Sequence, residues 1–154
     1  YGLKSATDLS SVCKDLVMAG PPEFQERAYG VSGLKEKYDC SFKSFQPIND
    51  GGGPLTVQAL TKGDAQVADI FTTTPAIQDE NLVVLDDPKN NFAAQNVLPL
   101  INKAKASEQV TATLNDVSAK LTTDKLAEML KQVVVDKKSA KAVAKTFLQA
   151  EGLA

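Results

Sequence analysis

Strand-like and helix-like segments alternate through the first seventy residues, and this alternation limits the folds that the chain can adopt. Residues 16–19, 42–45 and 67–71 are short apolar segments with the length and composition of strands. Between them, the sequence predicts helices that start near Pro22 and Leu55. Strands that alternate with helices favour a mainly parallel sheet flanked by helices. We therefore predict an α/β fold.

Capping residues place further helices. Ser5 and Asp8 have the spacing of a capping box, which predicts a helix that runs to about Leu16. Pro22 starts a second helix, which Gly30 and Gly33 interrupt before it resumes over residues 34–38. The glycine-rich turn at residues 49–54 starts a third helix, over residues 55–60, and Gly63 ends it.

The chain changes character after Ile101, where lysines become frequent and helical periodicity dominates. Thr122 or Thr123 caps a helix with an apolar face, and Ser139 caps a last helix that ends near Gly152. Acidic residues are interspersed with the lysines, so we interpret the lysines as a solvated outer face rather than a polyanion-binding surface. The C-terminal third is predicted to be helical.

Composition excludes several classes of function. Of the residues, 43% are apolar and 23% charged, which is ordinary for a soluble globular domain. A net charge of −2 gives no electrostatic footprint for nucleic acid. The chain has no histidine, the commonest general base and metal ligand. Asp86 and Asp87 are adjacent, and adjacent strand residues point to opposite faces, so they make a poor catalytic pair. We expect no enzyme activity, no metal and no cofactor.

Arg27 is the first candidate site residue. Proline is well suited to the first position of a helix, and Glu23 in the first turn is favourable against the helix dipole. Arg27 is expected about one turn beyond Glu23, close enough to the helix start to reach into a cleft. An arginine in that position can hold a carboxylate with two parallel hydrogen bonds.

The end of the third strand-like segment supplies further candidates. Phe71 is followed by Thr72, Thr73, Thr74 and a proline. Ligands of open α/β sheets bind at the carboxyl ends of strands. We therefore expect Phe71 and the threonines to line a cleft. Two more apolar segments follow, at residues 82–86 and 92–101, and we predict a strand for each.

Four motifs in this order carry a family resemblance. They are PPEFQER at residues 21–27, ALTKGDAQVAD at 59–69 after a glycine-rich turn, FTTTPAI at 71–77, and LVVLDDPKNNFAAQNVLPLI at 82–101. The chain resembles, from about Ser5 to Leu153, the substrate-binding proteins of glycine betaine, choline and carnitine ABC importers. The resemblance implies a two-lobed, periplasmic-binding-protein-like (type II) fold. It also implies an aromatic box for a quaternary ammonium group and an arginine for the ligand's carboxylate.

The resemblance assigns roles to individual residues. Arg27 matches the carboxylate-binding arginine, whereas Phe71 and Gln95 fall where box tyrosines are usual. Phenylalanine still offers a π face to a cation, worth roughly 0.5–2 kcal/mol. Glutamine offers only hydrogen bonds. We expect Thr72, Thr73 and Gln95 to supply polar contacts, with Glu23 beside Arg27.

The resemblance also implies that the chain is a fragment, since the family's first lobe begins well upstream of the segment that matches Tyr1. We expect residues 1–95 to be the second lobe. Residues 96–154 would be a returning strand and C-terminal helices of the first lobe. An apolar stripe on those helices would then be uncovered, which favours self-association. An unusually small family member is the alternative.

Cys13 and Cys40 are the only thiols in the chain. From the residues alone, two buried free thiols are an adequate interpretation. The extracytoplasmic location that the resemblance implies favours a disulfide instead, which would contribute roughly 3 kcal/mol by closing its loop.

The leading hypothesis for function is a solute-binding component of an ABC importer, which delivers a small quaternary-ammonium or zwitterionic osmoprotectant to a membrane permease. It would work outside the cytoplasm, in the periplasm or lipid-anchored at the outer face of the membrane. The alternative is an effector-sensing domain of a transcription regulator with the same architecture. A regulator needs a basic recognition helix, and none is found in this sequence.

Overall fold

The computed structural model describes residues 1–154. The chain separates into two compact units, Tyr1–Ala93 and Ala94–Ala154. All three strands belong to the first unit, and the regular elements of the second unit are helices.

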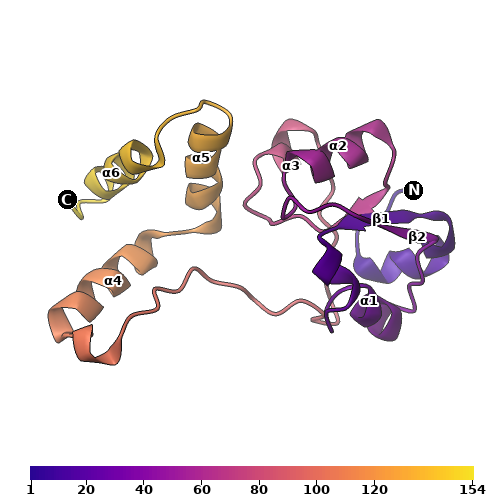
Figure 1. Ribbon diagram of the computed structural model, residues 1–154, viewed down its shortest axis with the longest axis horizontal. Coiled ribbons are helices and arrows are strands. Elements are labelled where there is room, and N and C mark those ends of the chain that lie inside the picture. The colour runs from indigo at the N-terminus through magenta and orange to yellow at the C-terminus, as the bar shows by residue number, and fades with distance from the viewer. The chain divides into compact units, whose positions relative to one another are not determined.

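The first unit is built on a three-stranded parallel sheet with the strand order β2-β1-β3 (Figure 1). In the register of the sheet, Met18 of the central strand lies opposite Phe45 on one side and Val67 on the other. The predicted α/β class with a mainly parallel sheet is confirmed. The strands are β1 (Val17–Gly20), β2 (Ser44–Pro47) and β3 (Val67–Ala68). The third strand is shorter than the predicted 67–71, so Phe71 lies beyond its end.

Helices cover both faces of this sheet. The α-helices of the first unit are α1 (Val31–Tyr38), α2 (Pro54–Lys62) and α3 (Ala76–Asp79). Gly63 ends α2 in the left-handed conformation, with φ of 81°, as the sequence predicts. Gly30 is the N-cap of α1, whereas Gly33 lies inside that helix and does not interrupt it.

Two predicted α-helices are instead short 3-10 helices. The helix expected from Ser5 to Leu16 consists of η1 (Ala6–Ser11) and η2 (Cys13–Asp15). The predicted capping box between Ser5 and Asp8 is present. The hydroxyls of Ser10 and Ser11 donate to the carbonyls of Thr7 and Asp8, three residues back, a local bonding pattern that competes with a regular α-helix.

A 3-10 helix also replaces the α-helix that the sequence predicts around Arg27. Only η3 (Pro22–Gln25) follows the prolines, and Glu26 is its C-cap. The chain then turns, because the N–H of Gly30 donates to the carbonyl of Arg27 at 2.8 Å. Arg27 therefore lies on the turn after η3 and not within a helix.

Alternation along β1 divides the core into two parts. Leu16 and Met18 belong to a cluster with buried side chains of η1, η3 and α1, whereas Ala19 packs with Ala59 of α2 and with Ala65. Successive strand residues point to opposite faces of a sheet, so one four-residue strand supports both layers. Figure 1 agrees, with α1 and α2 on opposite sides of β1.

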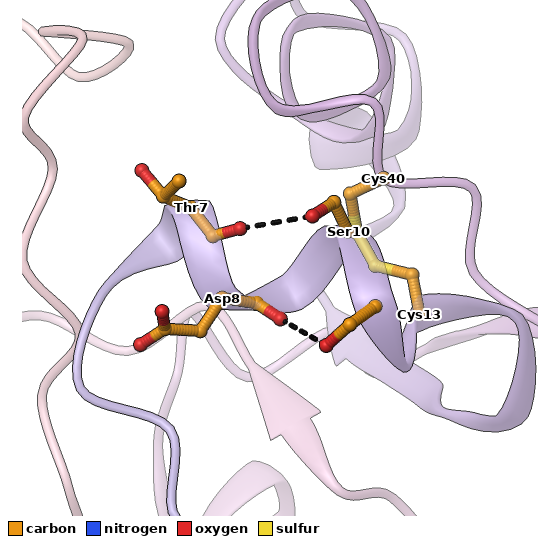
Figure 2. The surroundings of a disulfide bond; sticks show 6 residues. Thr7, Asp8, Ser10, Cys13 and Cys40 are labelled. Carbon is orange, nitrogen blue, oxygen red and sulfur yellow. Dashed lines mark hydrogen bonds between the residues drawn. A yellow bond between two sulfur atoms is a disulfide. The ribbon is translucent and has the colours of Figure 1, made fainter.

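A disulfide joins two segments of the larger core layer. Cys13 of η2 and Cys40, just after α1, are both buried and are bonded, with their Cα atoms 5.4 Å apart (Figure 2). The bond lies within the cluster that contains Leu9, Leu16 and Tyr38.

Neither strand predicted for residues 82–101 is present. In the first segment, only an isolated bridge pairs Asp86 with Ser5. In the second, Val97, Leu98 and Leu100 are 61%, 81% and 99% exposed. A strand needs a neighbour for its backbone groups, and residues 94–101 form no backbone hydrogen bond within their unit. The apolar composition was therefore not sufficient to predict strands here.

Asp87 ties the last segment of the first unit to α1. Its carboxylate accepts hydrogen bonds from the Tyr38 hydroxyl and from the backbone N–H groups of Asn91, at 3.0 Å, and Phe92, at 2.8 Å. Burial alone raises the pKa of Asp87, but the bonds from Tyr38, Phe92 and Asn91 outweigh it, so this pKa lies below its usual value.

We expect Asp87→Asn to lower the free energy of unfolding by about 1–3 kcal/mol, because it removes the charge from three hydrogen bonds. Since the folded pKa is below the unfolded one, Asp87 stabilises the fold above about pH 3.8, and this stabilisation is lost as the pH falls further. Urea unfolding of the unmodified protein and of Asp87→Asn at pH 7 and pH 3 measures this effect. The difference in the free energy of unfolding between the two proteins should be smaller at pH 3. Equal differences at both pH values would contradict it. Asp64→Asn, at an exposed position, is the control.

The second unit is helical. Its helices are η4 (Lys103–Lys105), α4 (Glu108–Lys120), α5 (Thr123–Val134) and α6 (Ala140–Ala150). The side chain of Thr122 caps α5, and Ser139 is the N-cap of α6 without a side-chain bond. Both predicted helix starts are thus confirmed. None of the helices in the chain combines the length and the apolar character that a membrane crossing requires.

The apolar faces of these helices enclose little core of their own. Val143 is the only buried residue of the second unit. An open apolar cavity of about 360 Å³ lies between side chains of all three α-helices and the segments beside them, among them Leu121, Met129 and Phe147. One ion pair, from Lys125 of α5 to Glu151 just after α6, supports their packing.

Candidate ligand-binding site

The carboxyl ends of β1 and β3 meet closely in the first unit. A Cβ atom placed on Gly20, the last residue of β1, would lie 3.3 Å from the Cβ of Asp69, which directly follows β3. Gly52, in the turn after β2, approaches the same place: its Cβ would lie 2.9 Å from the Asp69 carbonyl oxygen. With φ of 75°, Gly52 also has a backbone conformation that other residues rarely adopt. The three loops after the strands therefore converge at one edge of the sheet.

Asp50 holds the turn after β2 in this shape. Its carboxylate accepts hydrogen bonds from the N–H groups of Gly53, Leu55 and Thr56 and from the Thr56 hydroxyl, the last at 2.6 Å. Burial alone raises the pKa of Asp50, but the bonds from Thr56, Leu55 and Gly53 outweigh it and leave this pKa below its usual value. The free N–H groups at the start of α2 are thus already used by Asp50, and they are not available to an anionic ligand.

Arg27 is the only arginine of the chain, and it is close enough to this edge for its charge to act on Asp69. Its guanidinium donates a hydrogen bond to the Tyr29 hydroxyl and lies over the Tyr29 ring, 5.6 Å from the centroid. An oxygen of Glu23 is 3.8 Å from the guanidinium. The Arg27 side chain is 52% exposed, so a face of the guanidinium remains accessible to a ligand.

Sequence reasoning missed the aromatic support of Arg27. Tyr29 packs against the buried Phe24 and against Phe92, with ring centroids 6.3 and 6.0 Å away. Phe24 and Phe92 are also stacked on each other. The only signal in the sequence is that Tyr29 is two residues from Arg27, because nothing in it indicates that Phe92 returns to this place.

The threonine segment after β3 is a turn. The N–H of Thr74 donates to the carbonyl of Phe71 at 2.9 Å, with Thr72 and Thr73 between them. Phe71 is 61% exposed, so its ring is available for contact with a ligand. Both threonines are likewise at least partly exposed.

Asp69 was also missed as a site residue, although it lies only two residues before Phe71. Its side chain is half-buried and has no hydrogen bond or ion pair. Burial raises the pKa of Asp69, the charge of Arg27 lowers it, and the charge of Glu23 raises it; the net effect is a pKa above the usual value. Its place at the end of a strand was the signal that could have identified it.

The predicted site residues thus fall into two groups. At the carboxyl edge of the parallel sheet, the structure places Glu23 in η3, and Arg27, Phe71 and the two threonines in loops. Gln95 is exposed and belongs to the second unit. It is not brought together with the other predicted residues within either unit.

Small molecules bind to open α/β sheets at the carboxyl ends of the strands, and this edge carries an arginine, a free carboxylate and an exposed aromatic ring. Residues 1–150 match the family described as the substrate binding domain of ABC-type glycine betaine transport systems, OpuAC, and the chain belongs to this family. The class predicted from the sequence motifs is therefore confirmed. This family is a family of transport domains and not a class of enzymes.

Curated relatives and solved structures agree with this family. The chain is 27% identical over 155 residues to the ergothioneine transport permease/ergothioneine binding protein EgtU of Helicobacter pylori, covering 99% of this chain and 28% of that protein. It is 26% identical over 152 residues to the carnitine transport binding protein OpuCC of Listeria monocytogenes, covering 97% of this chain and 48% of that protein. The chain thus spans half or less of the length of these relatives.

Two solved structures share the fold. A glycine betaine/carnitine/choline ABC transporter structure superposes with a TM-score of 0.75 at 24% identity, covering 99% of this chain and 56% of the other. Apo YehZ from Escherichia coli superposes with a TM-score of 0.63 at 22% identity, covering 99% and 57%. At these identities the likeness shows the fold, which is that of the periplasmic-binding-protein-like proteins.

Proposed function

We propose that this chain belongs to the extracytoplasmic solute-binding component of an ABC importer. The component binds a small quaternary-ammonium or zwitterionic osmoprotectant and delivers it to the membrane permease. One observation carries the proposal: in a member of the OpuAC family, Arg27 and Phe71 lie in loops at the carboxyl edge of one parallel sheet, one accessible cation and one accessible aromatic ring. Phe71 can contact a quaternary ammonium group, and Arg27 can bind a carboxylate where the ligand has one.

Each candidate residue has a role in this proposal. Arg27 holds the ligand's carboxylate with its guanidinium fork. Phe71 presents its ring to the quaternary ammonium group, and Thr72, Thr73 and Gln95 supply polar contacts. Glu23 sits beside Arg27 and orients the guanidinium before the ligand arrives.

The domain assignment follows from the same family membership. We infer that the first unit, Tyr1–Ala93, is the second lobe of the binding protein, and that the helices of Ala94–Ala154 belong to the first lobe. The nearly coreless second unit supports this assignment, since its apolar faces need the rest of a lobe to cover them. In isolation, the same faces would favour self-association. Closure of two lobes on the solute produces the form that the permease recognises, which requires the ligand to bind the closed form better than the open one.

The test is calorimetric titration of glycine betaine, carnitine, ergothioneine and choline into the full-length gene product and its Arg27→Ala variant. The first three ligands carry a carboxylate, and choline does not. For these three, we expect Arg27→Ala to weaken binding by about tenfold or more, because a charge-assisted bidentate contact is lost. Choline binding should change by less than about threefold.

Lys35→Ala is the matched control, because it removes one positive charge from an exposed position on α1. It should leave all four affinities unchanged. If Arg27→Ala has no more effect than Lys35→Ala on the ligands with a carboxylate, Arg27 is not the anchor. If none of the four ligands binds the unmodified protein, the proposed solute class is wrong.

A further inference from the structure

We propose that Asp69 determines the specificity of this site: its carboxylate is the counter-ion of the ligand's cationic group, and it makes the site prefer a cation without a carboxylate over a zwitterion. This inference rests on the proposed function, because it concerns which member of that solute class is bound.

The position of Asp69 is fixed by the sheet. Its backbone N–H donates to the carbonyl of Ala19 in β1 at 2.9 Å, which extends the pairing of the two strands by one step. The Gly52 turn closes over its carbonyl oxygen, and Gly20 leaves room for its side chain. The backbone and Cβ of Asp69 are thus held in place at the edge of the sheet, two residues before Phe71 in the sequence.

The carboxylate is also unpaired. It is half-buried, yet no N–H, hydroxyl or ammonium group lies within hydrogen-bond or ion-pair distance of it. Taking a charged carboxylate partly out of water without a partner destabilises the fold, which is consistent with the raised pKa of Asp69. Carboxylates with a raised pKa cluster at functional sites, where a ligand can provide the missing charge.

The charges around it set the preference. Arg27 and Glu23 are the charged groups that interact with Asp69, and Glu23 already faces the guanidinium at 3.8 Å. One positive and two negative charges leave this edge of the sheet with one excess negative charge. A ligand with a net positive charge restores the balance, whereas a zwitterion adds a third carboxylate beside Glu23 and Asp69.

The chemistry of a quaternary ammonium group matches this setting. Because the group has no N–H, it gains nothing from hydrogen-bond acceptors as such and interacts through its charge and its methyl groups. The half-buried carboxylate of Asp69 provides a counter-charge, and the exposed ring of Phe71, two residues further along the chain, provides an apolar contact surface. The site is therefore best suited to a choline-like ligand, a quaternary ammonium with a neutral polar tail.

The test compares choline with its neutral isostere, 3,3-dimethyl-1-butanol, in the full-length gene product and its Asp69→Asn variant. Asparagine has nearly the same shape, so the variant removes charge without leaving a cavity. We expect choline to bind the variant about tenfold more weakly, and the neutral isostere to bind both proteins equally. The unmodified protein should bind choline more tightly than glycine betaine, and Asp69→Asn should narrow that difference. Asp64→Asn, at an exposed position before β3, is the matched control and should change nothing.

A second readout separates binding from folding. Because Asp69 is an unpaired charge, Asp69→Asn should raise the thermal midpoint while it weakens choline binding; a residue with only a structural role would not combine these two effects. If Asp69→Asn lost the same affinity for choline and for the neutral isostere, the counter-ion role would be overturned. The same conclusion would follow if it lost affinity for neither. Tighter binding of glycine betaine than of choline would overturn the preference while leaving the proposed function standing. If no quaternary amine binds the unmodified protein, both the proposed function and this inference are wrong.

Discussion

Gly30→Ala is expected to lower the free energy of unfolding by at least about 3 kcal/mol. A Cβ atom on Gly30 would lie 1.7 Å from the carbonyl oxygen of Phe24 and 2.7 Å from its carbonyl carbon. Both are backbone atoms, so no side-chain rotation relieves the overlap. Phe24 is 1% exposed and belongs to the larger core layer, which means that either the core or the start of α1 has to move.

Urea unfolding followed by circular dichroism measures the effect, and Gly63→Ala is the control. Gly63 has φ of 81° but no atom within 4 Å of an added Cβ, so its substitution costs only the backbone strain, about 1–2 kcal/mol. The comparison therefore separates steric overlap from left-handed strain. Similar losses in the two variants would show that the close approach of Gly30 and Phe24 does not exist in solution.

The same contact explains why sequence reasoning placed Arg27 wrongly. The double proline predicts a helix start, and a helix start is present, but the chain turns back after one turn of 3-10 helix because Gly30 packs on the Phe24 backbone. A glycine that permits close approach cannot be told from a glycine that merely interrupts a helix until the approaching residue is known. Local signals were sufficient where the bonds are local, as at Ser5, Gly63 and Thr122.

Long-range pairing accounts for the other differences. The alternation of strands and helices predicted the parallel sheet, because that pattern depends on periodicity alone. The strands predicted for residues 82–101 are absent, because a strand requires a partner and the sequence does not show whether one exists. For the site, the rule that ligands bind at strand ends placed Phe71 and the threonines, but it could not show that Asp69 is left without a partner.

Loss of the disulfide is expected to lower the free energy of unfolding by about 3–4 kcal/mol. The bond closes a loop with a sequence separation of 27 residues, and the loop-entropy relation gives this magnitude for such a length. Cys13 and Cys40 are 2% and 0% exposed, so the bond also holds two segments of the larger core layer together. Reduction by dithiothreitol under urea unfolding measures the loss. A Cys13→Ala, Cys40→Ala double variant should be destabilised as well, and its stability should not respond to the reductant.

Loss of the disulfide should also weaken ligand binding, because the loop that it closes contains β1, the turn with Arg27 and the whole of α1. Tyr38 of α1 anchors Asp87, which in turn fixes Phe92 against Tyr29, the residue that supports the guanidinium. Opening the loop loosens α1 and therefore Tyr38, the first residue in this series of contacts. Reduction should therefore weaken ligands that carry a carboxylate more than choline, which does not use Arg27. An unchanged free energy of unfolding after complete reduction, verified by thiol titration, would show that the hydrogen bonds and core contacts hold this layer without the disulfide.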